Sequence, residues 1–142
     1  MAKKNNLNGW SLTLLRVVLG IMFLYHGYSK LFVTGGFKGT IGFLTAIGIP
    51  LPLYSALLVS VAEFAGGALL ILGLLTRWSS IVLLVEMLVA FFKVHLQQGF
   101  FITKDAYGYE FILLIIAGLA VVAASGAGKL SVGSRVKNKQ MR

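Results

Sequence analysis

Four long apolar segments alternate with shorter polar segments along the 142 residues of the chain. The apolar segments cover residues 10–33, 53–75, 78–96 and 108–125. A helix needs roughly 20 residues to cross a hydrocarbon core of about 30 Å, and each segment is about that long. The pattern therefore predicts an all-α integral membrane protein whose residues 1–130 form a single domain, a bundle of four transmembrane helices.

The segment between the first two apolar runs has a different pattern. Residues 34–52 are rich in Gly and end in the sequence Pro-Leu-Pro. Their apolar residues, such as Phe37, Ile41 and Leu44, recur at nearly helical spacing. We therefore expect a short amphipathic or re-entrant helix at the membrane surface, in a position to cap a cavity.

The other connections are short. Thr76 and Arg77 predict a tight turn between the second and third spans, which forces these helices into an antiparallel hairpin. Gly126 and Gly128 are expected to end the fourth helix. Residues 131–142 then form a basic tail, which is expected in the cytoplasm.

Composition supports a membrane location and excludes several chemistries. Hydrophobic residues make up 58% of the chain and charged residues 12%, with a mean hydropathy of +0.89, more apolar surface than a soluble domain of this length can cover. Cys is absent, which excludes disulfides, thiolate catalysis and Cys-ligated iron–sulfur clusters. The net charge of +9 resides mostly in tails and loops beside apolar runs, which favours contact with membrane lipid over nucleic acid.

The distribution of Lys and Arg predicts the orientation. If the N-terminus is inside, Lys38 and Lys104 are the basic residues of the outer loops. The inner side then holds the basic residues of both termini and of the second connection: Lys3, Lys4, Arg77, Lys129, Arg135, Lys137, Lys139 and Arg142. The positive-inside rule therefore favours an N-in/C-in, multi-pass protein of a prokaryotic inner (plasma) membrane.

Ionisable residues inside the spans are the informative chemistry, because each costs about 2.5–3.5 kcal/mol at mid-helix. At about 100° per residue, each predicted helix carries one polar face that is rich in small residues. The members of these faces are Arg16, Gly20, Gly27 and Lys30 on the first helix; Ser60, Glu63, Gly66 and Gly67 on the second; Ser79, Glu86 and Lys93 on the third; and Glu110 with Gly118 on the fourth.

These faces predict a charged interior that opens toward the outer side. Three cations, Arg16, Lys30 and Lys93, and three carboxylates, Glu63, Glu86 and Glu110, would line it. Other roles are open for each residue. Arg16, Glu63 and Glu86 can serve as buried ion pairs that fix helix register, the lysines can snorkel to the headgroups, and Glu110 can begin a helix near its positive end.

His26 has three possible roles: an interfacial hydrogen-bonding residue, a proton relay or an axial haem ligand. His95 is the only other imidazole in the chain. In a regular helix its side chain points about 180° away from Glu86, so haem bound by two histidines is disfavoured. The sequence predicts no metal site.

The order of these motifs resembles the DoxX family. The matching residues lie between Leu14 and Leu130: Arg16, Gly20, Phe23, His26, Gly27 and Lys30; then Glu63, Gly66, Gly67, Gly73, Thr76 and Arg77; then Gly108 and Glu110. The resemblance implies a small prokaryotic four-helix membrane protein. Some members of the family resemble a subunit of thiosulfate:quinone oxidoreductase, and others are linked to quinone detoxification or oxidative stress. The resemblance also implies that His26, Lys30, Glu63 and Glu110 are site residues.

These residues leave three hypotheses for function. The first is a redox-associated, quinone-binding subunit: Glu63 and His26 would be catalytic, a partner protein would supply electrons, and the quinone would be bound by Lys30, Arg16, Glu86, Lys93 and Glu110. The second is a non-catalytic assembly subunit that docks a larger complex or a second copy of the chain. The third is a transporter of a small solute or of protons.

Overall fold

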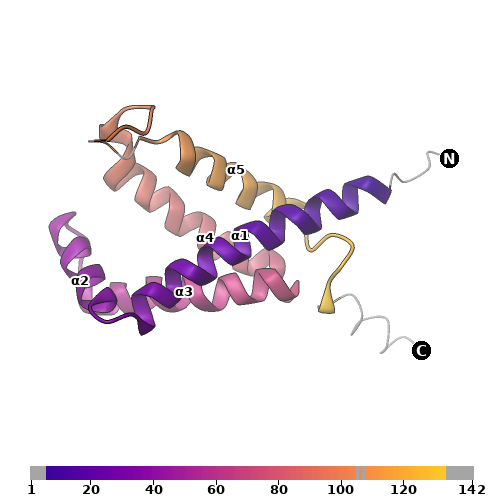
Figure 1. Cartoon of the computed structure of the whole chain (residues 1–142), viewed down its shortest axis with the longest axis horizontal. Helices are drawn as coiled ribbons and strands as arrows, with labels where there is room; N and C mark the ends of the chain where they lie inside the picture. Colours follow the sequence, from indigo (N-terminus) through magenta and orange to yellow (C-terminus); the bar gives the residue numbers. More distant parts are fainter. Residues whose placement is uncertain (1–5, 105, 107, 134–142) are drawn as a thin grey trace.

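The computed structural model describes residues 6–104, 106 and 108–133, and this part of the chain is helical (Figure 1). Its helices are α1 (Asn6–Phe32), α2 (Gly36–Ala46), α3 (Pro52–Leu72), α4 (Thr76–Ala90) and α5 (Glu110–Ser125). A π-helical turn, Phe91–His95, and a 3₁₀ turn, Leu96–Gln98, extend α4. Residues 134–142 of the predicted tail lie outside the described residues.

Three helical segments in the described part are long and apolar enough to cross a membrane. They are Gly9–Phe32, Pro52–Leu72 and Thr76–Gln98. The helix α5 is apolar but has 16 residues. Large apolar side chains lie exposed along all of them, as expected where lipid is the solvent. The all-helical membrane architecture predicted from the hydrophobic pattern is therefore confirmed.

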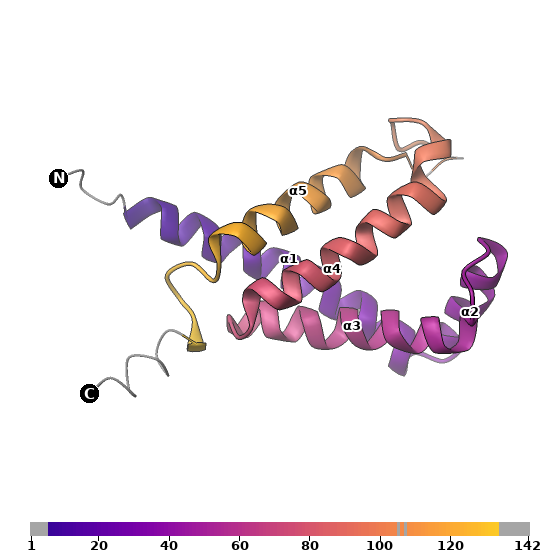
Figure 2. The same cartoon turned by 180° about the vertical axis from the view of Figure 1, so that it is seen from behind.

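The helices pack in antiparallel pairs (Figures 1 and 2). The helix α1 packs along α3, and α5 packs along α4. The helices α3 and α4 meet at a tight turn and diverge away from it, while α2 stands at the far end of α3. A core of Leu and other apolar residues joins α1, α3, α4 and α5: Leu19, Phe23, Leu70, Leu83, Ile115, Leu119 and Val122.

Glycine and proline set the ends of these helices. Pro52 begins α3, where a missing backbone N–H costs nothing. Gly73 ends α3 with a φ of 71°, in the left-handed region that glycine tolerates. The turn between α3 and α4 therefore spans residues 73–75. The prediction that Thr76 and Arg77 form it is wrong, since both already belong to α4 and the turn begins three residues earlier.

The small-residue face that the sequence predicted on α1 packs against α3. A Cβ atom added to Gly20 would lie 2.9 Å from the carbonyl oxygen of Gly67, and one added to Gly27 would overlap the backbone of Phe64. The backbones of the two helices therefore approach as closely as glycine permits, which is the usual reason for small residues between membrane helices. This contact fixes how the polar side chains of α1 and α3 meet.

Arg16 joins the ends of two helices. Its side chain is 1% exposed. The guanidinium donates hydrogen bonds to the carbonyl oxygens of Leu70 (2.6 Å) and Ile71 (3.3 Å) at the end of α3, and of Leu130 (2.5 Å) beyond α5. Carbonyls at a helix C-terminus lack intrahelical donors, so the cation satisfies them and matches the helix dipole. In this structure Arg16 is a cap for α3.

Candidate functional site: a charged cavity between three helices

A cavity of about 950 Å³ lies between α2, α3 and α4, with the end of α1 at its side. Its walls are mostly apolar, and they include Phe43 and Leu44 from α2, Leu58 from α3 and Val85 from α4. The described ionisable residues in the lining are His26, Lys30, Glu63, Glu86 and His95. The site therefore combines a large apolar volume with a few charged groups, the usual composition of a small-molecule site.

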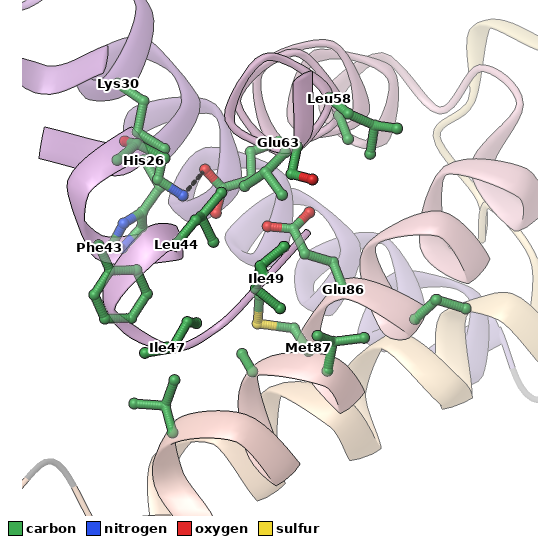
Figure 3. A pocket seen from close by; sticks show the side chains of 18 of the residues that line it. His26, Lys30, Phe43, Leu44, Ile47, Ile49, Leu58, Glu63, Glu86 and Met87 are labelled. Carbon is green, nitrogen blue, oxygen red and sulfur yellow. Dashed lines mark hydrogen bonds and ion pairs between the residues drawn. The ribbon is translucent and has the colours of Figure 1, made fainter. Parts of the chain in front are cut away.

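Lys30 and Glu63 form an ion pair across the contact between α1 and α3 (Figure 3). The Nζ atom of Lys30 donates to Oε2 of Glu63. The Lys30 side chain is 24% exposed and that of Glu63 5%. Gly27 lies one helical turn before Lys30 and packs on Phe64, next to Glu63, so the close glycine contact places the two charged side chains within reach.

Glu86 extends from α4 toward the carboxylate of Glu63, on the opposite side of the cavity from α1 (Figure 3). The two carboxyl groups interact electrostatically. The Oε2 atom of Glu86 is buried and has no hydrogen-bond partner among the described residues. The cavity therefore contains two acids beside one lysine, and one buried oxygen among them is unsatisfied.

His95 lines the same cavity, although the sequence indicated that it faces the other way. That expectation assumed a regular helix from Glu86 onward. The residues 91–95 instead form a π-helical turn, which holds more residues per turn and so rotates the side chains within and beyond it. Such turns are frequent at functional sites. His26, at the end of α1, also lines the cavity.

The structure separates the other predicted site residues from this cavity. Lys93 is exposed, so the expected polar line through Ser79, Glu86 and Lys93 is wrong at its last member, where the π turn interrupts the helix. Glu110 begins α5, and its Oε1 atom accepts a hydrogen bond from the backbone N–H of Ile102 at 2.9 Å. Arg16 caps α3 and is not part of the lining.

The helix α2 supplies one wall of the cavity. Its sequence predicted a short amphipathic helix, and this helix is present at Gly36–Ala46. Thr40 and Leu44 are its buried residues, and both line the cavity. The hydroxyl of Thr40 donates back to the carbonyl oxygen of Gly36 at 2.9 Å, so the α2 side of the cavity presents mainly apolar groups. In the sequence, the helical spacing of the apolar residues indicated both this helix and its apolar side.

The arrangement suits a molecule with an apolar body and a polar head. Apolar walls exclude water, which strengthens every electrostatic interaction at the charged cluster. Carboxyl and imidazole groups can donate, accept and exchange protons with such a head group. No group of three or more potential metal ligands occurs among the described residues.

Comparison with known proteins places the chain in a family. The model of the DoxX family matches residues 11–96. An "Uncharacterized protein" of Haemophilus influenzae is 34% identical over 134 residues, 90% of this chain and 92% of its own length. "Putative oxidoreductase CatD" of Bacillus subtilis is 34% identical over 102 residues, 72% of this chain and 70% of its own.

A third relative gives the cellular location. "Inner membrane protein YphA" of Escherichia coli is 26% identical over 129 residues, 87% of this chain and 89% of its own. No solved structure matches the chain. With three apolar helices of spanning length, these relatives indicate a multi-pass protein of the bacterial inner membrane. The chain belongs to the DoxX family.

Proposed function

We propose that the cavity binds a membrane quinone and that the protein is the quinone-binding subunit of a redox system. The observation that carries this proposal is the combination of an apolar cavity of about 950 Å³ with a partly buried Lys30–Glu63 pair and Glu86 in its wall. A quinone has the matching chemistry, since its ring oxygens form hydrogen bonds and its tail is apolar. The name of the Bacillus subtilis relative, which includes the word oxidoreductase, agrees with a redox role.

The residues have distinct parts in this proposal. Lys30 or His26 donates a hydrogen bond to a quinone oxygen, and Glu63 handles a proton as the quinol forms or reacts. Reduction of a quinone needs two electrons and two protons. A reduced partner protein supplies the electrons, because no Cys-ligated centre can form on a chain without Cys.

The route into the cavity leads from the lipid. Phe43 on α2 and Val82, Val85 and Val89 on α4 line the cavity, and about half of the surface of each residue is exposed. These residues lie on helices that border the membrane phase, so an apolar molecule reaches the site between α2 and α4 without crossing water. A lipid-soluble substrate fits this access better than a water-soluble one.

Analysis of gently purified protein tests the proposal. Mass spectrometry and an optical spectrum should reveal a quinone that remains bound to the wild-type chain and is depleted in the variant Lys30→Met. The matched control is Lys38→Met, because Lys38 is exposed on α2 and outside the cavity lining. Wild-type protein that neither retains nor binds any quinone would refute the proposal. A stable partner without quinone would instead favour the assembly subunit.

The four-span, N-in/C-in topology belongs to the same proposal. The 16 residues of α5 rise about 24 Å, so a crossing by α5 requires a thinned bilayer or flanking residues that complete the span. Trp10 lies exposed near one end of α1, and Lys129 lies over its ring at 5.4 Å from the centroid. Such a Trp–Lys pair suits the cytoplasmic interface.

Single cysteines, introduced into a chain that has none, test this topology. A membrane-impermeant maleimide should label Thr34→Cys and Lys104→Cys in intact cells. It should label Arg77→Cys and Val132→Cys only after permeabilisation. Labelling of Lys104→Cys and Val132→Cys from the same side would exclude a crossing by α5.

A further inference from the structure

The geometry points to Glu86 as a further residue of this cavity that touches the ligand head group, as a neutral carboxyl that donates a hydrogen bond to a quinone oxygen. Lys30 and Glu63 keep the parts proposed above, and their ion pair holds the counter-charge beside Glu86. The inference rests on the proposed quinone site and adds an assignment within it. The sequence predicted Glu86 as one of five quinone-binding residues, and the inference gives it a specific role as a hydrogen-bond donor.

The first step is hydrogen-bond satisfaction. Buried carboxyl oxygens almost always have partners, because an unpaired one loses its hydration without compensation. Glu63 has a partner in Lys30, and the side chains of Glu63 and Glu86 are hydrogen-bonded to each other, whereas the Oε2 atom of Glu86 is buried and has no partner among the described residues. A bound ligand is the simplest source of the missing partner, since Glu86 lies in the cavity wall.

The second step is charge. The charged groups that interact with Glu86 are Glu63 from α3 and Lys30 from α1, and the imidazoles of His26 and His95 line the same cavity. Two carboxylates beside one ammonium leave an uncompensated negative charge in an apolar environment, which is costly. One proton on a carboxyl group makes the cluster neutral. Glu63 is paired directly with Lys30, so we place the proton on Glu86.

The third step is the class of ligand. A neutral carboxyl group carries an O–H donor, and a quinone ring offers carbonyl oxygens as acceptors. The wall around Glu86 is apolar, with Val82, Val85 and Met87 as near neighbours on α4 that line the cavity. A ring with a carbonyl oxygen therefore matches this part of the site better than an anion, which the neighbouring Glu63 would repel.

Binding of a decyl-substituted benzoquinone to the purified protein in mild detergent tests the assignment. Glu86→Met removes the donor and should weaken binding about tenfold, the typical value of one hydrogen bond. Glu86→Gln keeps an N–H donor and mimics a neutral carboxyl, so its affinity should stay within about threefold of wild type. Leu88→Met is the matched control on the same helix, outside the cavity lining, and should bind as wild type does.

A spectroscopic readout separates a ligand contact from a structural role. Addition of the quinone should shift the infrared carbonyl band of a protonated carboxylic acid in wild-type protein, and the shift should be absent in Glu86→Gln. Wild-type protein that binds quinone while Glu86→Met binds it equally well would overturn the assignment and leave the quinone site intact. Wild-type protein that binds no quinone would overturn the proposed function, and the assignment with it.

Discussion

The ammonium group of Lys30 on α1 pairs with the carboxylate of Glu63 on α3, at a place where glycine lets the two helices touch. The pair holds the two helices together and also neutralises one positive and one negative charge in the cavity wall. If one partner is removed, a charge remains in an apolar setting, whereas removal of both leaves a neutral interface. The pair therefore makes a direct prediction about stability.

We expect Lys30→Met and Glu63→Gln each to lower the free energy of unfolding by at least about 1 kcal/mol, a modest value because Lys30 is partly exposed. The double variant should cost less than the sum of the two by about 1–2 kcal/mol. Equilibrium unfolding in detergent micelles measures all three. Lys38→Met should stay within about 0.5 kcal/mol of wild type. Additive single effects would show that the pair contributes no coupling.

Gly27 makes a second prediction. Because a Cβ atom at this position overlaps the backbone of Phe64, Gly27→Ala must separate α1 from α3 and should destabilise the protein by about 1–3 kcal/mol. Gly42→Ala is the matched control. A Cβ atom there meets nothing within 4 Å, so the variant should be neutral or up to about 1 kcal/mol more stable. Thermal unfolding of the two variants side by side decides the point, and equal melting temperatures would contradict the close contact.

Arg16 provides a third prediction. Its planar guanidinium reaches carbonyl oxygens of both Leu70 and Leu130, which an ammonium group cannot match with the same geometry. Arg16→Lys should therefore lower the unfolding free energy by about 2 kcal/mol or more, because hydrogen bonds to charged groups are strong and buried carbonyls lose their donor. Arg77→Lys, at an exposed position, should change it little. A similar small effect of both substitutions would show that Arg16 is not a cap.

The sequence predicted the packing faces well where the helices are regular. A rotation of about 100° per residue places Arg16, Gly20, Gly27 and Lys30 on one side of α1, and the structure has all four turned toward α3. The same arithmetic gave the buried face of α3, which includes Glu63. Periodicity succeeds here because packing and hydrogen bonding both depend on the regular helical turn.

The prediction failed where the chain departs from that turn or where distant elements meet. Lys93 was expected to face the interior and His95 to face away, but His95 lines the cavity and Lys93 is exposed. The π turn at residues 91–95 alters the helical periodicity, and no residue in the turn indicates this change in the sequence. The cavity itself depends on the divergence of α3 from α4 and on the position of α2. Those are tertiary relationships, which a pattern along the chain does not contain.

Filling the cavity tests the central claim, that this space holds a quinone, most directly. Ala62 lines the cavity on α3, and Ala65 is exposed on the same helix outside the lining, so Ala62→Phe and Ala65→Phe form a matched pair. The measurement is the equilibrium affinity of each purified variant for a decyl-substituted benzoquinone. The account predicts at least tenfold weaker binding by Ala62→Phe, about 1.4 kcal/mol, and wild-type affinity for Ala65→Phe. Equal affinity of the two variants would contradict it.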